Sequence, residues 1–144
     1  MKEPVHIDRD KNCISQVREF MRNELEAFRL SDTDRNQITL AVEETCCNSI
    51  EHGHPSGNQN DFLLSVYNEG DDTVVIDIFD PAPPFDIATY ESKTIENLSQ
   101  TGANGGLGIK LIKTIMDKVE VVDNKGCCIY RLRKKLCPNS EKNK

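Results

Sequence analysis

The chain has 144 residues, which suits one domain with one sizeable hydrophobic core. Its formal net charge of -6 and its pI of about 5.1 exclude a global basic field, so we expect no direct binding to nucleic acid or to an anionic membrane. No apolar run approaches the roughly 20 residues that cross a bilayer, and the start of the chain lacks the apolar core of a signal peptide. We therefore expect a cytoplasmic protein.

The first predicted elements are a short strand and a helix. The strand covers 4–7, PVHI. After Asn12, apolar residues recur at steps of three and four, which predicts an amphipathic helix that ends at about residue 29. The residues that carry this spacing are Ile14, Val17, Phe20, Met21, Leu25 and Phe28.

A second helix is predicted after a break. Residues 30–34, LSDTD, contain the candidate cap residues Ser31 and Thr33. The helix then covers about 34–52, with one side formed by Ile38, Val42, Thr45, Cys46 and Ser49. Residues 53–61 have the composition of a loop.

Two strands follow, over 62–67 and 73–79, and the intervening NEGDD predicts a hairpin turn. The polar stretch 86–104 comes after the second strand. A connection this long inside a small domain is usually disordered or functional, and we interpret it as a lid.

The chain closes with a third helix and a second hairpin. The helix is predicted over 105–118 from Ile109, Leu111, Ile112, Ile115 and Met116. The hairpin ends near Leu136, and 137–144 form a polar tail. This order predicts an α+β fold in which 1–136 form a single domain, a two-layer α/β sandwich with one mixed, mostly antiparallel sheet.

The six cysteines show no CxxC spacing. We interpret them as buried thiols that pack as small apolar side chains. A zinc site that joins some of them to His52 and His54, or a redox role, is an alternative that the spacing supports poorly. The cysteines are Cys13, Cys46, Cys47, Cys127, Cys128 and Cys137.

The second predicted helix carries the first candidate site, Glu44-x-x-x-Asn48. Side chains four residues apart lie on one face of a helix. A carboxamide oxygen is a suitable ligand for Mg²⁺, and a carboxylate one turn away could accept a proton from a hydroxyl that attacks a phosphate. For this pair alone, the simpler interpretation is a partly exposed polar flank.

The second candidate site is DIFDPAPPFD, in which Asp80 ends an apolar strand. A carboxylate there could accept a hydrogen bond from an exocyclic amine such as that of adenine, and the small Ala82 would let a flat ring approach. The simpler interpretation is an Asp-Pro turn at the end of a strand.

The third candidate site is TGANGGLGIKLI, which leads into the third predicted helix. Its glycines permit close approach of backbone N–H groups to an oxyanion, and a helix N-terminus favours negative charge. The segment is not a Walker loop, since no Gly-Lys-Ser/Thr follows, and it does not come directly off a strand as a dinucleotide fingerprint would. A flexible glycine hinge is the simpler interpretation.

The order of these three segments resembles the N, G1 and G2 boxes of the GHKL superfamily, which has the Bergerat ATP-binding fold. The resemblance extends from about residue 4 to 136. The segments ITLAVEETCCNSIEHG, DPAPPFD and GGLGIKLIKTIMDKVEV are most similar to one branch, the anti-sigma factor serine/threonine kinases of bacterial partner-switching systems.

This resemblance implies ATP and Mg²⁺ as cofactors. Glu44 would be the base for phosphoryl transfer, Asn48 would ligate Mg²⁺, and Asp80 would recognise the adenine amine. The nucleotide-binding set would comprise Asn48, Asp80, Ala82, Phe85, Gly102, Gly105, Gly106, Leu107 and Gly108. The implied partners are a STAS-type anti-anti-sigma protein as substrate and a sigma factor, and the resemblance also allows a homodimer.

Two departures from the family pattern affect this interpretation. Ala82 replaces the first glycine of the G1 box, which we expect to weaken ATP binding without abolishing it. Glu43 adjoins Glu44, but only Glu44 stands four residues before Asn48. The alternatives are a non-catalytic, ATP-gated binding module and, less well supported, a detached histidine-kinase catalytic domain.

Overall fold

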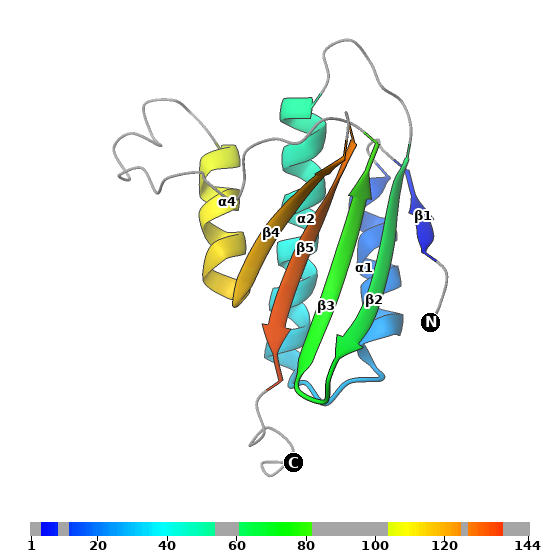
Figure 1. Ribbon diagram of the computed structural model, residues 1–144, viewed down its shortest axis with the longest axis vertical. Helices are drawn as coiled ribbons and strands as arrows, with labels where there is room; N and C mark the ends of the chain where they lie inside the picture. Colours follow the sequence, from blue (N-terminus) through cyan, green and yellow to red (C-terminus); the bar gives the residue numbers. More distant parts are fainter. Residues whose placement is uncertain (1–3, 9–11, 54–60, 82–103, 125–126, 137–144) are drawn as a thin grey trace.

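The computed structural model describes residues 4–8, 12–53, 61–81, 104–124 and 127–136. These residues form five strands and three helices, with two helices after the first strand and one helix between two hairpins (Figure 1). In chain order the elements are β1 (Val5–Ile7), α1 (Cys13–Leu25), α2 (Asp32–Gly53), β2 (Phe62–Glu69), β3 (Thr73–Asp80), α4 (Asn104–Ile115), β4 (Lys118–Asn124) and β5 (Cys127–Lys135).

The strands form one sheet in the order β1-β2-β3-β5-β4. Each neighbouring pair of described strands is antiparallel, so no parallel pairing is seen within the described part of the sheet. The central strand β3 pairs through Ile78 with Leu64 of β2 and with Tyr130 of β5. The predicted α+β sandwich with a mostly antiparallel sheet is confirmed.

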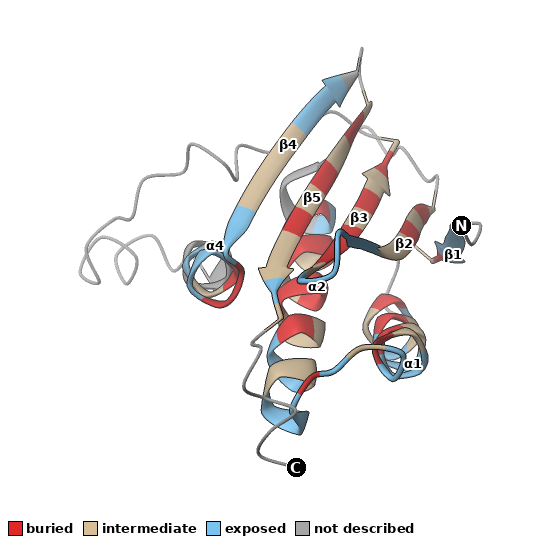
Figure 2. Ribbon diagram, turned by 60° about the horizontal axis from the view of Figure 1, so that its bottom comes forward, coloured by how far each residue is buried: buried red, intermediate tan, exposed pale blue. Residues whose placement is uncertain are grey.

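The helices cover one face of this sheet, with α2 in the middle and α1 and α4 on either side of it (Figure 1). The buried residues of α1, α2 and the central strands lie toward one another (Figure 2). Because α2 has neighbours on three sides, its buried residues extend well beyond one narrow stripe. Its fully or nearly fully buried residues are Ile38, Ala41, Val42, Glu43, Thr45, Cys46, Asn48 and Ser49.

The predicted helix limits were displaced by a few residues. Helix α1 ends at Leu25, four residues before the predicted end, and α4 ends at Ile115, three residues early. Just after α4, the backbone N–H of Asp117 donates to the carbonyl of Arg133 at 2.9 Å, so the chain has already joined the sheet. Helix α2 begins at Asp32, two residues before the predicted start.

Two local features match the sequence prediction. Ser31 caps α2, because its hydroxyl accepts a hydrogen bond from the backbone N–H of Asp34 at 3.0 Å. The turn between β2 and β3 contains Gly70 with a φ of 65°, a conformation that favours glycine. Of the described helices, none is long and apolar enough to cross a membrane.

Candidate functional site

Three segments that are distant in sequence lie toward the same end of the molecule. The C-terminal half of α2, the last residue of β3 and the first turn of α4 all lie there (Figure 1). The first two segments are joined directly, because the hydroxyl of Ser49 in α2 donates a short hydrogen bond to Oδ2 of Asp80 in β3. The structure therefore links the residue that follows Asn48 in α2 to Asp80 at the end of β3.

Asp80 is a fully buried carboxylate, with an exposed fraction of 0%. A buried carboxylate needs hydrogen-bond donors, and Ser49, itself 1% exposed, supplies one of them. The helical spacing predicts only that Ser49 lies on the core-facing side of α2. Its position directly after Asn48 is the one sequence feature that could have identified it. Its partner Asp80 is 31 residues away and is identified only by the fold.

Asn48 is buried as well, with 1% of its surface exposed, so the interpretation as a partly exposed flank is wrong for this residue. Its Nδ2 donates to the backbone carbonyl of Glu44 at 2.7 Å, which orients the amide. Its Oδ1 is then the one buried side-chain nitrogen or oxygen in the described residues without a hydrogen-bond partner. A buried acceptor without a donor is costly, and an amide oxygen is a hard ligand, so this atom fits a magnesium ion.

The two adjacent glutamates have different environments. Glu43 is 4% exposed and binds Arg18 of α1, with Nε to Oε2 at 2.7 Å and Nη2 to Oε1 at 3.5 Å. This hydrogen bond and the charge of Glu43 raise the pKa of Arg18 above its ordinary value. Glu44 is half-buried and lies one turn before Asn48. Because Arg18 binds both carboxylate oxygens of Glu43, Glu44 is the better candidate of the two glutamates for a site residue.

Helix α4 contains Gly105, Gly106 and Gly108, as the predicted helix over 105–118 did. Helix α4 begins at Asn104, so Gly105, Gly106, Leu107 and Gly108 occupy its first two turns. Backbone N–H groups in the first turn of a helix have no intrahelical acceptor and can bind an anion. Three further predicted nucleotide-binding residues, and nearly all of the predicted lid 86–104, lie outside the described residues. These residues are Ala82, Phe85 and Gly102.

The described cysteines form no disulfide. Two causes raise the pKa of Cys46 well above its ordinary value: mainly a hydrogen bond with Cys13, and in addition the burial of the thiol. Burial raises the pKa of Cys128 to about 12. Within the described ranges, no group of three or more His, Cys, Asp or Glu side chains could hold a metal ion. His54 of the alternative zinc site lies outside the described residues.

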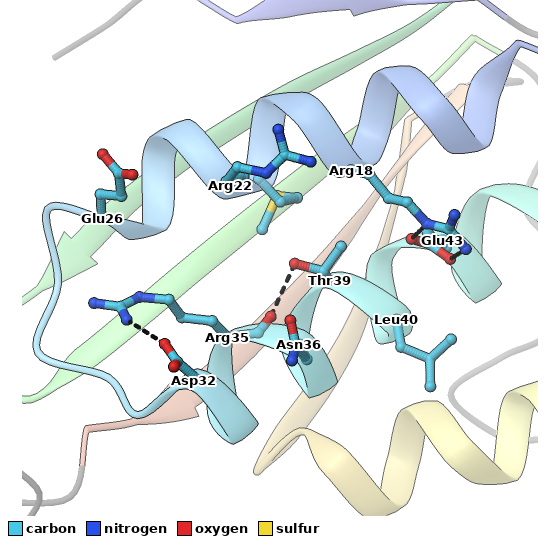
Figure 3. Close-up of a pocket in the computed structure, with 10 residues that line it drawn as sticks. Arg18, Arg22, Glu26, Asp32, Arg35, Asn36, Thr39, Leu40 and Glu43 are labelled. Atoms are coloured by element: carbon cyan, nitrogen blue, oxygen red, sulfur yellow. Dashed lines mark hydrogen bonds and ion pairs between the residues drawn. The ribbon is translucent and has the colours of Figure 1, made fainter.

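A groove of about 620 Å³ lies apart from this site, along the side of α2 that faces α1. Arg18 and Arg22 reach it from α1, and Arg35 and Thr39 reach it from α2 (Figure 3). The Arg18–Glu43 pair stands at one end of this groove (Figure 3). The pair thus connects the groove to the segment of α2 that carries Glu44 and Asn48.

Comparisons with known proteins agree with this arrangement. The family model of the histidine kinase-like ATPase domain matches residues 7–134. The serine-protein kinase RsbW of Halalkalibacterium halodurans is 32% identical over 101 residues, which cover 65% of this chain and 58% of that protein. RsbW of Staphylococcus aureus strain Newman is 32% identical over 102 residues, covering 67% and 63%. The chain spans about three fifths of the length of these curated relatives.

Solved structures show the same fold. The RsbU and RsbW domains of a Mycobacterium tuberculosis protein match with a TM-score of 0.64 at 18% identity, over 94% of this chain and 33% of that one. The histidine kinase domain of a blue-light-activated kinase from Erythrobacter litoralis EL346 matches with a TM-score of 0.56 at 12% identity, over 92% and 65%. The chain therefore belongs to the histidine kinase-like ATPase domain family and has the GHKL fold.

Proposed function

We propose that this protein is an ATP-dependent serine/threonine-protein kinase that acts as an anti-sigma factor in a partner-switching system. Its substrate is a STAS-type anti-anti-sigma protein, and its second partner is a sigma factor. The observation that carries the ATP site is the buried Oδ1 of Asn48, which has no donor and lies on the helix turn next to the Ser49–Asp80 contact. The names of the relatives, serine-protein kinases, support the choice of a kinase.

The roles of the polar residues follow from their positions. Asn48 Oδ1 would hold Mg²⁺ together with oxygen ligands from the nucleotide and water, since no cluster of acidic side chains is available among the described residues. The ion supplies neutralising charge to the phosphates. Glu44, one turn before Asn48, accepts the proton of the attacking hydroxyl.

Asp80 recognises the base. Ser49 holds one of its oxygens, and this contact orients the carboxylate so that it can accept a hydrogen bond from the exocyclic amine of adenine. The first turn of α4 offers backbone donors to the phosphates. The family resemblance adds Phe85 and Gly102 to the expected nucleotide-binding residues. The resemblance to partner-switching kinases further supports a cytoplasmic location and a homodimer.

A second function remains to be distinguished by experiment, a non-catalytic module in which ATP selects the binding partner. Ala82, in place of the family's glycine, favours it, because a methyl group would crowd the base. The presence of Glu44 favours the kinase, because a binding module needs no base. The two functions differ in one measurable step, the transfer of phosphate to a protein hydroxyl.

The decisive experiment is calorimetric titration with a non-hydrolysable ATP analogue, with and without Mg²⁺, followed by a phosphotransfer assay on STAS-type proteins. Asn48→Ala should abolish Mg²⁺-dependent binding, whereas Glu44→Ala should preserve binding and remove phosphotransfer. Tight magnesium-dependent binding by Asn48→Ala would contradict the metal assignment. Undiminished phosphotransfer by Glu44→Ala would contradict the assignment of the base.

A further inference from the structure

The Arg18–Glu43 pair is an unusual feature of α2, because it places a carboxylate under the surface directly before the proposed base. The Glu43 side chain is 6% exposed, whereas the Arg18 side chain is 62% exposed. The guanidinium of Arg18 thus covers Glu43 from the solvent side. A carboxylate buried without a cation pays a large desolvation penalty, so Glu43 depends on this arginine to remain under the surface.

The site-bearing turn of α2 is held from two directions. On the sheet side, Ser49 donates to Asp80 of β3. On the side of α1, Glu43 is bound by Arg18 through both carboxylate oxygens. These two links to other elements bracket Glu44 and Asn48 along the helix, and together they oppose rotation of α2 about its own axis.

We infer that Arg18 is a positioning residue for the nucleotide site, because it fixes the rotation of α2 by holding Glu43 under the surface. This inference rests on the proposed function, in which Glu44 and Asn48 act on ATP and magnesium. All three side chains belong to one rigid helix. Any rotation that carries Glu43 out to water therefore turns Glu44 and Asn48 away from their present directions.

The test compares four full-length variants in Mg²⁺-dependent binding of a non-hydrolysable ATP analogue. Arg18→Gln leaves the Glu43 carboxylate without its cation and should weaken binding by about tenfold or more. Glu43→Gln removes the charge and should change binding by no more than about threefold. In the double variant Arg18→Gln/Glu43→Gln, binding affinity should recover to within about threefold of wild type. This variant has no carboxylate at position 43, so no buried charge lacks a partner.

Arg22→Gln is the matched control, since it removes an exposed arginine one turn further along α1 and should leave binding unchanged. If Arg18→Gln only lowers stability and its folded fraction binds as tightly as wild type, Arg18 has a merely structural role and the inference fails. A double variant as weak as Arg18→Gln would also overturn it, because the effect would then not act through Glu43.

Hydrogen exchange of the apoprotein separates this inference from the proposed function. In Arg18→Gln, amides of 43–49 should exchange at least about threefold faster, while the double variant and Arg22→Gln should match wild type. If wild type does not bind the nucleotide, the proposed function fails, but this exchange pattern would still support the control of α2 by Arg18. Unchanged exchange of 43–49 in Arg18→Gln would refute the positioning role whatever the nucleotide result.

Discussion

Of the α2 residues whose burial the structure describes, four polar ones are buried, and three of these, Glu43, Asn48 and Ser49, have different hydrogen-bond partners. Glu43 has a cation from α1, and Ser49 donates to a carboxylate on β3. Asn48 satisfies its amide nitrogen within the helix and leaves its oxygen without a donor. Buried polar groups in proteins are normally hydrogen-bonded, so the exception at Asn48 indicates a position that is built for a ligand.

Removal of the Ser49 hydroxyl tests whether this contact supports base recognition. Ser49→Ala should lower the free energy of unfolding by about 2 kcal/mol, because a buried carboxylate loses a charge-assisted hydrogen bond. Affinity for an adenine nucleotide should fall in the same variant, since Asp80 loses one of the contacts that orient its carboxylate. Urea unfolding and calorimetric titration measure the two effects.

Ser15→Ala, on the exposed side of α1, is the control for the loss of a hydroxyl. It should leave nucleotide affinity unchanged and alter stability by less than about 0.5 kcal/mol. Wild-type adenine affinity in Ser49→Ala would show that Asp80 does not need this donor. Loss of affinity without loss of stability would limit the role of Ser49 to the ligand itself.

At the scale of elements, helix periodicity predicted more of the structure than any single motif did. The spacing of four between Glu44 and Asn48 placed them on one face, and the hydrogen bond from Asn48 Nδ2 to the Glu44 carbonyl confirms this. The buried side of α2 was also predicted correctly. The partners of Glu43 and Ser49 could not be predicted, because they lie 25 and 31 residues away and depend on how the elements pack.

The limits of α1 illustrate the same distinction. Apolar spacing continues to Phe28, and Phe28 does pack against the core, but the helix ends at Leu25. Arg35 of α2 reaches back to this end, with hydrogen bonds to the carbonyls of Leu25 at 3.5 Å and Phe28 at 3.3 Å. A cation at the C-terminus of a helix is favourable, so tertiary contact stabilises an end that local spacing does not mark.

Arg35→Ala should therefore loosen the connection between α1 and α2. We expect a loss of about 1–2 kcal/mol in the free energy of unfolding, because Arg35 no longer donates to the carbonyls of Leu25 and Phe28 or to the carboxylate of Asp32. Arg22→Ala removes an arginine from the same groove and should cost less than about 0.5 kcal/mol. Urea unfolding measures both variants, and equal losses would show that Arg35 contributes no more than its neighbour.

At the scale of the whole molecule, the sheet pairs strand β5 with strand β3 from the middle of the sequence. Strand β5, the last described element, pairs with both β3 and β4, and its Tyr130 and Leu132 are fully buried in the common core. The central region of the sheet is therefore incomplete until the C-terminal hairpin has formed. This non-local pairing explains why one cooperative unit is expected from a chain whose helices are predicted locally.

Groups whose pKa is raised in the folded protein make the free energy of unfolding fall at alkaline pH. Burial raises the pKa of Cys128 to about 12, and it is the main cause of the raised pKa of Tyr67. Cys46, hydrogen-bonded to Cys13, also has a raised pKa. A group whose pKa is higher in the folded state contributes stability that is fully present below its unfolded pKa and is lost as pH rises toward the folded value. For Cys128 this window runs from about 9 to about 12.

The free energy of unfolding should consequently decline between pH 9 and 10.5, a range within the window of about 9 to about 12 set by Cys128. One thiol contributes a slope of at most about 1.4 kcal/mol per pH unit. Cys128→Ala should make the decline shallower, because the thiol whose pKa is raised by burial is removed. Urea unfolding at several pH values gives the slope of the free energy of unfolding against pH for each variant. A loss of stability that is the same at every pH does not change this slope. A slope in Cys128→Ala as steep as that of wild type would show that this thiol is not the group that links folding to alkaline pH.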